Sequence, residues 1–232
     1  MKSTEQQLRS RGMATDTDIR ALSERSVVDL LHLLDTGEAH IRSAAAINLR
    51  QYVDLICDKL LLQLSREKCL YTRIAIGESL QEGSLVTARK MAVYLGRIGN
   101  NQHRCLPDKV SAKKTFPLPR DIVARYMGRM DPAVFPFVLD VLGGEEITKI
   151  YEALDAAGDM VFRNPELGNE ENCEFLISLV GRHEADVMIL WKVILCLSVF
   201  PCRRARDFLK SYLDDSTVIG MEAKRSLTWI GK

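Results

Sequence analysis

The stretch HIRSAAAINL, residues 40–49, places Arg42 directly before a run that contains three successive alanines. Small residues three and four positions after Arg42 let a helix lie close against its neighbours. Leu49, seven positions after Arg42, would fill the space between adjacent helices. This stretch therefore predicts a helix that packs closely against other helices.

The same frame returns along the chain, which predicts a repeated structural unit. In RIAIGESL, which starts at Arg73, small or apolar residues again stand three and four positions after the arginine, and Leu80 stands seven positions after it. Further copies start at Arg120, Ile147, Met188 and Gly220. The irregular offsets between these starts lie near the length of a two-helix repeat. Ile147 and Met188 replace the arginine, so the repeat boundaries there are less well defined.

Hydrophobic periodicity predicts helices in the remainder of the chain. Apolar residues recur at spacings of three and four, for example at Val28, Leu31 and Leu34, and short breakers separate the segments. No alternation typical of a strand extends over five or more positions. The predicted fold is all-α, a right-handed α-α superhelix of about six helix pairs.

At these residues the chain resembles the HEAT repeats, and more closely the short PBS-lyase HEAT-like repeats. The resemblance is carried by DTGEAHIRSAAAINL at 35–49, YLGRIG at 94–99 and LTWIGK at 227–232. It covers residues 24–232 and implies an armadillo-type solenoid. Residues 1–23 are polar and are interpreted as a flexible arm or a partial cap, in which Thr15, Asp16, Thr17 and Asp18 offer N-caps for a short helix.

Three arginines that open a copy of the frame, Arg42, Arg73 and Arg120, are expected to be structural. Such a guanidinium can hydrogen-bond a carboxylate or the turn carbonyls of an adjacent repeat and connect the two repeats. Asp35, at the end of the preceding helix, is the candidate partner of Arg42.

Composition and motifs exclude several classes of function. The chain has 232 residues, 47% of them hydrophobic, with a formal net charge of +1, so its whole surface is not built for nucleic acid. No glycine-rich phosphate loop, catalytic triad motif or spaced Cys/His quartet occurs, and His103 with Cys105 forms at most half a metal site. We therefore expect no catalysis, no metal and no cofactor.

Neither the N-terminus nor the longest apolar run has the pattern of a segment that enters a membrane. The N-terminus lacks the apolar region of a signal peptide, so a cytoplasmic location is expected. The run from Val187 to Phe200 contains Lys192 and is too short to span a bilayer. Because this run is apolar on nearly every side, it predicts a helix covered by its neighbours.

The six scattered cysteines are expected to be free thiols.

One enzymatic resemblance concerns the two tryptophans. DNA glycosylases of the DNA-alkylation-repeat type are also built from HEAT-like helix pairs, and they hold the damaged nucleotide against tryptophans beside a carboxylate. Trp191 and Trp229 stand at different positions of their frames, and neither has a carboxylate four residues away. Both tryptophans are therefore interpreted as filling gaps between helices.

Charge is distributed unevenly along the chain. Residues 97–129 carry eight basic side chains against two acidic ones, whereas residues 131–174 carry eleven acidic against two basic. The basic segment includes residues 99–119, the one long interruption of the repeats, with prolines and apolar residues that favour an ordered loop. Both charged segments are also compatible with solvated faces that attract each other.

A partner site is predicted on this loop and on the helix that follows it. Ile122, Val123, Tyr126, Met127 and Met130 have core spacing, which would leave Asp121, Arg125 and Arg129 on the open side with an Asp121–Arg125 pair. The predicted partner-binding residues are Arg104, Lys113, Lys114, Arg125 and Arg129. In the alternative interpretation the loop is purely internal and packs against Glu145 or Glu152.

The expected function is that of an interaction scaffold or adaptor that binds a protein or peptide, acidic or phosphorylated, on a concave or basic face. Two alternatives stay open. One is a nucleic-acid-binding protein or a glycosylase of the DNA-alkylation-repeat type, and the other is a bilin lyase-type subunit. The sequence does not identify the partner or the oligomeric state.

Overall fold

A computed structural model describes residues 3–113 and 115–230, and every regular element in these ranges is helical. The prediction of an all-α protein is therefore confirmed over this part of the chain. The chain divides into two compact units, Met1–Tyr94 and Leu95–Lys232, and each is described by itself.

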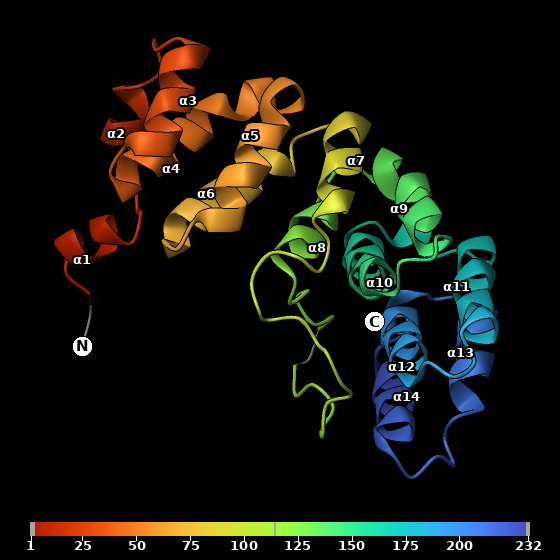
Figure 1. Cartoon of the computed structure of the whole chain (residues 1–232). Coiled ribbons are helices and arrows are strands. Elements are labelled where there is room, and N and C mark those ends of the chain that lie inside the picture. Colours follow the sequence, from red (N-terminus) through yellow and green to blue (C-terminus); the bar gives the residue numbers. More distant parts are fainter. Residues whose placement is uncertain (1–2, 114, 231–232) are drawn as a thin grey trace. The chain divides into compact units, whose positions relative to one another are not determined.

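Residues 3–94 of the first unit contain seven α-helices and one short 3-10 helix, coloured from red to yellow in Figure 1. They are α1 (Glu5–Ser10), α2 (Asp16–Arg20), α3 (Val27–Thr36), α4 (Ala39–Asn48), η1 (Leu49–Tyr52), α5 (Val53–Arg66), α6 (Leu70–Leu80) and α7 (Leu85–Val93). Helix α4 contacts both α3 and α6, and α5 contacts α6 and α7.

The helix that contains the alanine run packs as its sequence predicts. Ala44, Ala45 and Ala46 are fully buried in α4, and Leu49 is fully buried just after it. Because their side chains are short, backbone and hydroxyl groups of α4 and α6 meet directly: Ser79 Oγ donates to the Ala46 carbonyl at 2.8 Å. The close approach of α4 and α6 therefore follows from small residues on both helices.

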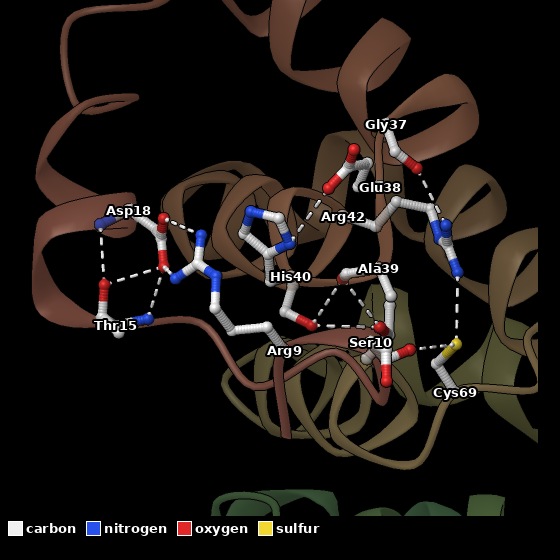
Figure 2. Close-up of polar contacts among 12 residues, drawn as sticks. Arg9, Ser10, Thr15, Asp18, Gly37, Glu38, Ala39, His40, Arg42 and Cys69 are labelled. Atoms are coloured by element: carbon white, nitrogen blue, oxygen red, sulfur yellow. Dashed lines mark hydrogen bonds and ion pairs between the residues drawn. The ribbon is translucent and has the colours of Figure 1, made fainter. Parts of the chain in front are cut away.

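Arg42 connects α4 to the end of α5, but through a different acid from the one predicted. Its Nε and Nη2 donate to Glu67 at 2.8 Å each, and Nη1 donates to the Gly37 carbonyl at 2.8 Å. Figure 2 shows this guanidinium between Gly37 and Cys69. The predicted partner Asp35 is instead exposed and paired with Arg66. Arg42 thus does connect adjacent helix pairs, with a buried carboxylate in place of the surface one.

The Arg42–Glu67 ion pair makes the free energy of unfolding depend on pH in the acidic range. Burial raises the pKa of the Glu67 carboxyl, but hydrogen bonds from Arg42, the Cys69 N–H and Gln63 outweigh burial and lower it from 4.5 to about 2. A carboxyl whose pKa is lowered on folding stabilises the fold above the unfolded value and loses that contribution as pH falls from about 4.5 toward 2. The unfolding free energies of wild type and Glu67→Gln should therefore converge by about 2 kcal/mol between neutral pH and about pH 3 in urea titrations. A difference that does not change with pH would contradict this assignment.

Residues near the N-terminus form two short helices on α4. Thr15 caps α2 in a reciprocal arrangement with Asp18, as predicted. The Asp18 carboxylate also forms an ion pair with Arg9, whose Nη1 donates to Oδ2 at 2.8 Å (Figure 2). Between these helices Gly12 has a φ of 95°, a backbone conformation that favours glycine, and lies against Thr72 of α6. Both α1 and α2 contact α4, so residues 4–22 cover this end of the unit.

The described part of the second unit begins with residues 95–113 and 115–121, which contain no regular helix, and continues with seven α-helices and three short 3-10 helices. They are α8 (Ile122–Met127), η2 (Pro132–Val134), α9 (Phe135–Leu142), α10 (Ile147–Arg163), η3 (Pro165–Leu167), α11 (Glu170–Arg182), α12 (Val187–Cys196), η4 (Leu197–Val199), α13 (Arg203–Lys210) and α14 (Val218–Trp229). Helix α10 contacts α8, α9 and α12, and α12 contacts α14 (Figure 1).

Most of the apolar run from Val187 to Phe200 is buried, as predicted, although Val187 at its start is 53% exposed and Leu190 and Val199 are half-buried. In α12, all residues from Trp191 to Cys196 are buried, and Phe200 is fully buried after η4. Lys192, the one charge in this run, is also buried. No helix among the described residues is long and apolar enough to cross a membrane.

Candidate functional site

The loop at 99–119 forms one side of a pocket of about 390 Å³ in the second unit. The other side consists of α10, α12 and α14, which contribute Asp155, Trp191 with Leu195, and Glu222. Loop residues on the pocket include His103, Lys109, Lys113 and Pro117. Side chains from these three helices, from α8 through Arg125, and from one long loop therefore meet at a single cavity.

Arg225 of α14 attaches the loop to the helices. This guanidinium donates to the carbonyls of Ser111 at 3.0 Å and Thr115 at 3.2 Å, and its Nη1 pairs with Glu222 at 2.7 Å. Only 8% of the Arg225 side chain is exposed. Because buried charge-assisted hydrogen bonds fix both partners, Arg225 holds the middle of the loop at a defined place over α14.

Phe116 provides a second attachment, over α10. Its ring lies against Gly158, where an added Cβ would come within 2.3 Å of Phe116 Cζ, and it stacks on Phe162 with ring centroids 6.3 Å apart. Gly158 thus leaves the space that the aromatic side chain occupies. These contacts place Phe116 of the loop against α10.

The start of the loop is held by Asp121, which corrects the predicted role of this residue. Asp121 is fully buried and accepts hydrogen bonds from Gly96 N, Gln102 Nε2 and Ala124 N. Burial raises the pKa of its carboxyl, against those hydrogen bonds. Asp121 is therefore the N-cap of α8 and lies inside the unit, neither on an open face nor in a pair with Arg125.

Arg125 and Arg129 have largely structural contacts. Arg125 donates from Nε and Nη2 to the Pro119 carbonyl at 3.1 and 3.0 Å, so it fixes the end of the loop, although it also borders the pocket. Burial lowers the pKa of Arg125. Arg129 lies over the Tyr126 ring at 5.5 Å, with its Nε buried, and does not border the pocket. The predicted inward positions Val123, Tyr126, Met127 and Met130 are buried, whereas Ile122 is only half-buried.

Exposed basic side chains surround the opening of the pocket. Lys109, Lys113 and Arg120 are exposed and line it. Arg104 is exposed but is not part of the lining, and Lys114 lies outside the described residues. Of the predicted binding residues, the structure therefore brings Lys113 and Arg125 to the pocket and adds Lys109 and Arg120. We call Lys109, Lys113 and Arg120 the basic rim.

The arginines that open a copy of the frame are not equivalent, although their sequences align. Arg42 is paired across helix pairs, and Arg73 is half-buried with its Nε lacking a hydrogen-bond partner among the described residues. Arg120 is exposed on the rim, and it forms no ion pair with a described residue. Arg120 precedes α8, whereas Arg42 lies within α4, which explains why the two side chains face different surroundings.

The inner wall of the pocket combines an aromatic side chain with carboxylates. Trp191 is 4% exposed, its ring meets that of His103 edge to face at 4.9 Å, and its Nε1 has no hydrogen-bond partner among the described residues. Glu222 Oε2 is likewise buried without a partner. Spacing along one helix could not reveal this arrangement, because the acids that share the pocket with Trp191 come from other helices. Trp229 lines a separate pocket.

Behind this wall lies a buried charge cluster. Lys192 Nζ is 2.8 Å from Asp155 Oδ2 and 3.9 Å from Glu152 Oε2, and the Lys192 side chain is fully buried. Burial raises the pKa of Glu152, which Lys192 opposes and Asp155 reinforces. Glu152 therefore lies against Lys192, and Arg104 of the loop also acts to lower its pKa, whereas Glu145 is exposed.

Neither a metal site among the described residues nor a match to a known protein points to a function for this pocket. No group of three or more His, Cys, Asp or Glu side chains in the described ranges is arranged to hold a metal ion. His103 faces Trp191, whereas Cys105 is exposed. No protein-family model and no curated protein sequence matches the chain.

Proposed function

We propose that this chain is a HEAT-like helical-repeat protein, a solenoid of about six helix pairs, that serves as a scaffold or adaptor without catalysis of its own. Its partner is an acidic or phosphorylated segment of a protein, which enters the pocket beneath the loop at 99–119. The repeated packing of second helices supports the solenoid: α4 contacts α6, α8 contacts α10, α10 contacts α12, and α12 contacts α14.

The observation that carries the proposed binding activity is the basic rim. Lys109, Lys113 and Arg120 are exposed around one pocket, whereas the buried cations nearby, Lys192 and Arg225, are each paired with a carboxylate. The rim therefore contributes positive charge that the protein itself does not neutralise in the described ion pairs. Anionic groups are attracted to such a rim and can accept hydrogen bonds from it.

A nucleic acid is the second candidate partner, favoured by one observation. Trp191 shares the pocket with Asp155 and Glu222, so an aromatic ring and carboxylates do lie together, although the sequence spacing argued against it. Trp191 is 4% exposed and His103 already contacts its ring, which leaves little of its face for a base to stack on. The peptide proposal is therefore preferred.

The rim can be tested by pull-down from the native cell with wild type and with Lys109→Gln/Lys113→Gln/Arg120→Gln. We expect the triple variant to lose the partner while its melting temperature stays within about 2 °C of wild type, because exposed charges contribute little to stability. Arg129→Gln is the control, because Arg129 does not border the pocket, and we expect it to retain the partner. Retention of the partner by the triple variant would refute the site.

A gel shift with single- and double-stranded DNA at low and high salt separates the two candidates. Binding by a nucleic-acid partner would show a strong salt dependence and would be lost in the triple variant. We expect no specific shift at physiological salt.

A further inference from the structure

A second pocket lies on the other side of the loop attachment. It has a volume of about 380 Å³ and is lined mainly by apolar side chains, among them Phe116, Phe162, Val199, Pro201 and Trp229. Phe162 is 45% exposed, which is unusual for a large aromatic side chain beside a cavity. We call this the apolar pocket, and the one with the basic rim the basic pocket.

Helices α10 and α14 contribute to both pockets in the same order, and so does the segment from α12 to η4. Helix α10 contributes Asp155 to the basic pocket and Phe162 to the apolar pocket, and α14 contributes Glu222 and then Trp229. Trp191 of α12 and Val199, which follows it in η4, repeat this order. Thus α10, α12 and α14 present one continuous face, with the basic pocket toward their N-terminal ends and the apolar pocket toward their C-terminal ends.

The loop reaches from the basic pocket to the apolar pocket and back. Ser111 and Lys113 border the basic pocket, Thr115 and Phe116 border the apolar pocket, and Pro117, Leu118 and Pro119 border the basic pocket again. Arg225, which donates to the loop carbonyls, lies one turn from Glu222 and one turn from Trp229 on α14. The turn that contains Thr115 and Phe116 therefore lies beside both pockets; we call it the strap, and a ligand that lies over it can reach both pockets at once.

Helix geometry gives the distance between the pockets. Asp155 and Phe162, like Glu222 and Trp229, are seven residues apart in one α-helix, which corresponds to about 10 Å along the axis. An extended peptide advances about 3.3 Å per residue, so a direct path spans three residues and a path over the strap adds one or two.

We infer that the partner segment is bipartite: an acidic or phosphorylated residue binds at the basic pocket, and a bulky apolar residue three to five positions away binds in the apolar pocket. The inference rests on the proposed binding of an anionic peptide and specifies its second determinant. Charge on the rim selects the first residue, and removal of apolar surface from water favours the second.

The test uses synthetic fluorescein-labelled peptides in a Gly/Ser background. Each carries a phosphoserine followed by a glutamate, and one phenylalanine placed one to seven residues away on either side; a control series carries no phenylalanine. Anisotropy titrations with the full-length chain should show binding of the control peptide, and about tenfold or greater tightening when phenylalanine stands three to five residues away.

Variants of the protein separate the contribution of the apolar pocket to the affinity from that of the basic pocket. Phe162→Ser should bring the affinity for the phenylalanine peptides down to that for the control peptide. This ratio is measured within the variant, because Phe162 also stacks on Phe116 of the loop. Lys113→Gln/Arg120→Gln should weaken binding of both peptides. Leu62→Ser is the matched control, since Leu62 is also an exposed apolar side chain, at 50%, but lines neither pocket. Thermal melts of all variants verify that they are folded.

The failures of the two proposals are distinguishable. If the control peptide binds through Lys113 and Arg120 but phenylalanine adds nothing at any spacing, or its gain survives Phe162→Ser, the bipartite inference is wrong and the proposed function stands. If no phosphorylated peptide binds, or binding is indifferent to Lys113→Gln/Arg120→Gln, both are wrong.

Discussion

Replacing Lys192 with alanine should lower the free energy of unfolding by about 3–5 kcal/mol, one of the two largest effects expected in this chain. The Lys192 ammonium is fully buried between α10 and α12 and lies 2.8 Å from Asp155. Its removal leaves Asp155 and Glu152 buried without a compensating charge and also creates a cavity. Urea denaturation followed by circular dichroism measures the loss.

Two further variants separate charge from volume. Lys192→Met keeps most of the volume and should still be strongly destabilised, whereas Lys192→Met combined with Asp155→Asn should recover a large part of the loss because the unpaired charge is gone. A loss below about 1 kcal/mol in Lys192→Ala would mean that the cluster is hydrated and that the packing between α10 and α12 is looser than described.

The second large effect is expected at Arg225. Replacement with methionine leaves Glu222 buried and unpaired, and it also removes the donors to Ser111 and Thr115, so we expect a loss of about 3–5 kcal/mol. Burial already raises the pKa of Glu222, which Arg225 opposes. The loop should also become more mobile, because its backbone carbonyls lose these partners.

Hydrogen exchange measured by mass spectrometry distinguishes the two consequences. In Arg225→Met/Glu222→Gln the buried charge is removed and global stability should recover, while exchange in the loop should remain faster than in wild type. Phe116→Ala is a useful comparison, since it releases the other attachment of the loop without changing charge. Unchanged exchange in both variants would contradict the account of the loop as a strap held at two points.

Local patterns in the sequence predicted the helices and the close packing of α4. Three alanines in succession and a leucine one turn later are sufficient to indicate a tightly packed helix, and Ala44, Ala45, Ala46 and Leu49 are all fully buried. The same spacing predicted the buried side of α8 almost completely. These features depend on residues within one or two turns of each other, so the sequence alone contains the necessary information.

The helical pattern was wrong for Asp121 because this residue precedes α8. Its backbone is extended and its carboxylate accepts from Ala124 N, as N-cap side chains do, so the helical wheel does not apply to it. The preference for aspartate at helix starts was the signal available in the sequence. For Arg42, proximity in sequence favoured Asp35, whereas the actual partner Glu67 is 25 residues away at the end of α5.

The pocket itself could not be predicted from local spacing. Asp155, Trp191 and Glu222 belong to three different helices, and they come together because α10, α12 and α14 pack side by side. The sequence did indicate that residues 99–119 are long, basic and anchored by apolar side chains. It could not indicate that Lys113 and Arg120 would face the same cavity, because that depends on where Arg225 and Phe116 fasten the loop.

The most direct test of the proposed function is hydrogen exchange of the full-length chain with and without the phosphoserine-glutamate-phenylalanine peptide. We predict that protection on binding concentrates in residues 103–120 and on α10, α12 and α14, and that it disappears in Lys109→Gln/Lys113→Gln/Arg120→Gln. Protection confined to the first unit, where Leu55 of α5 and Val86 of α7 expose apolar side chains, or protection that persists in the triple variant, would contradict the account.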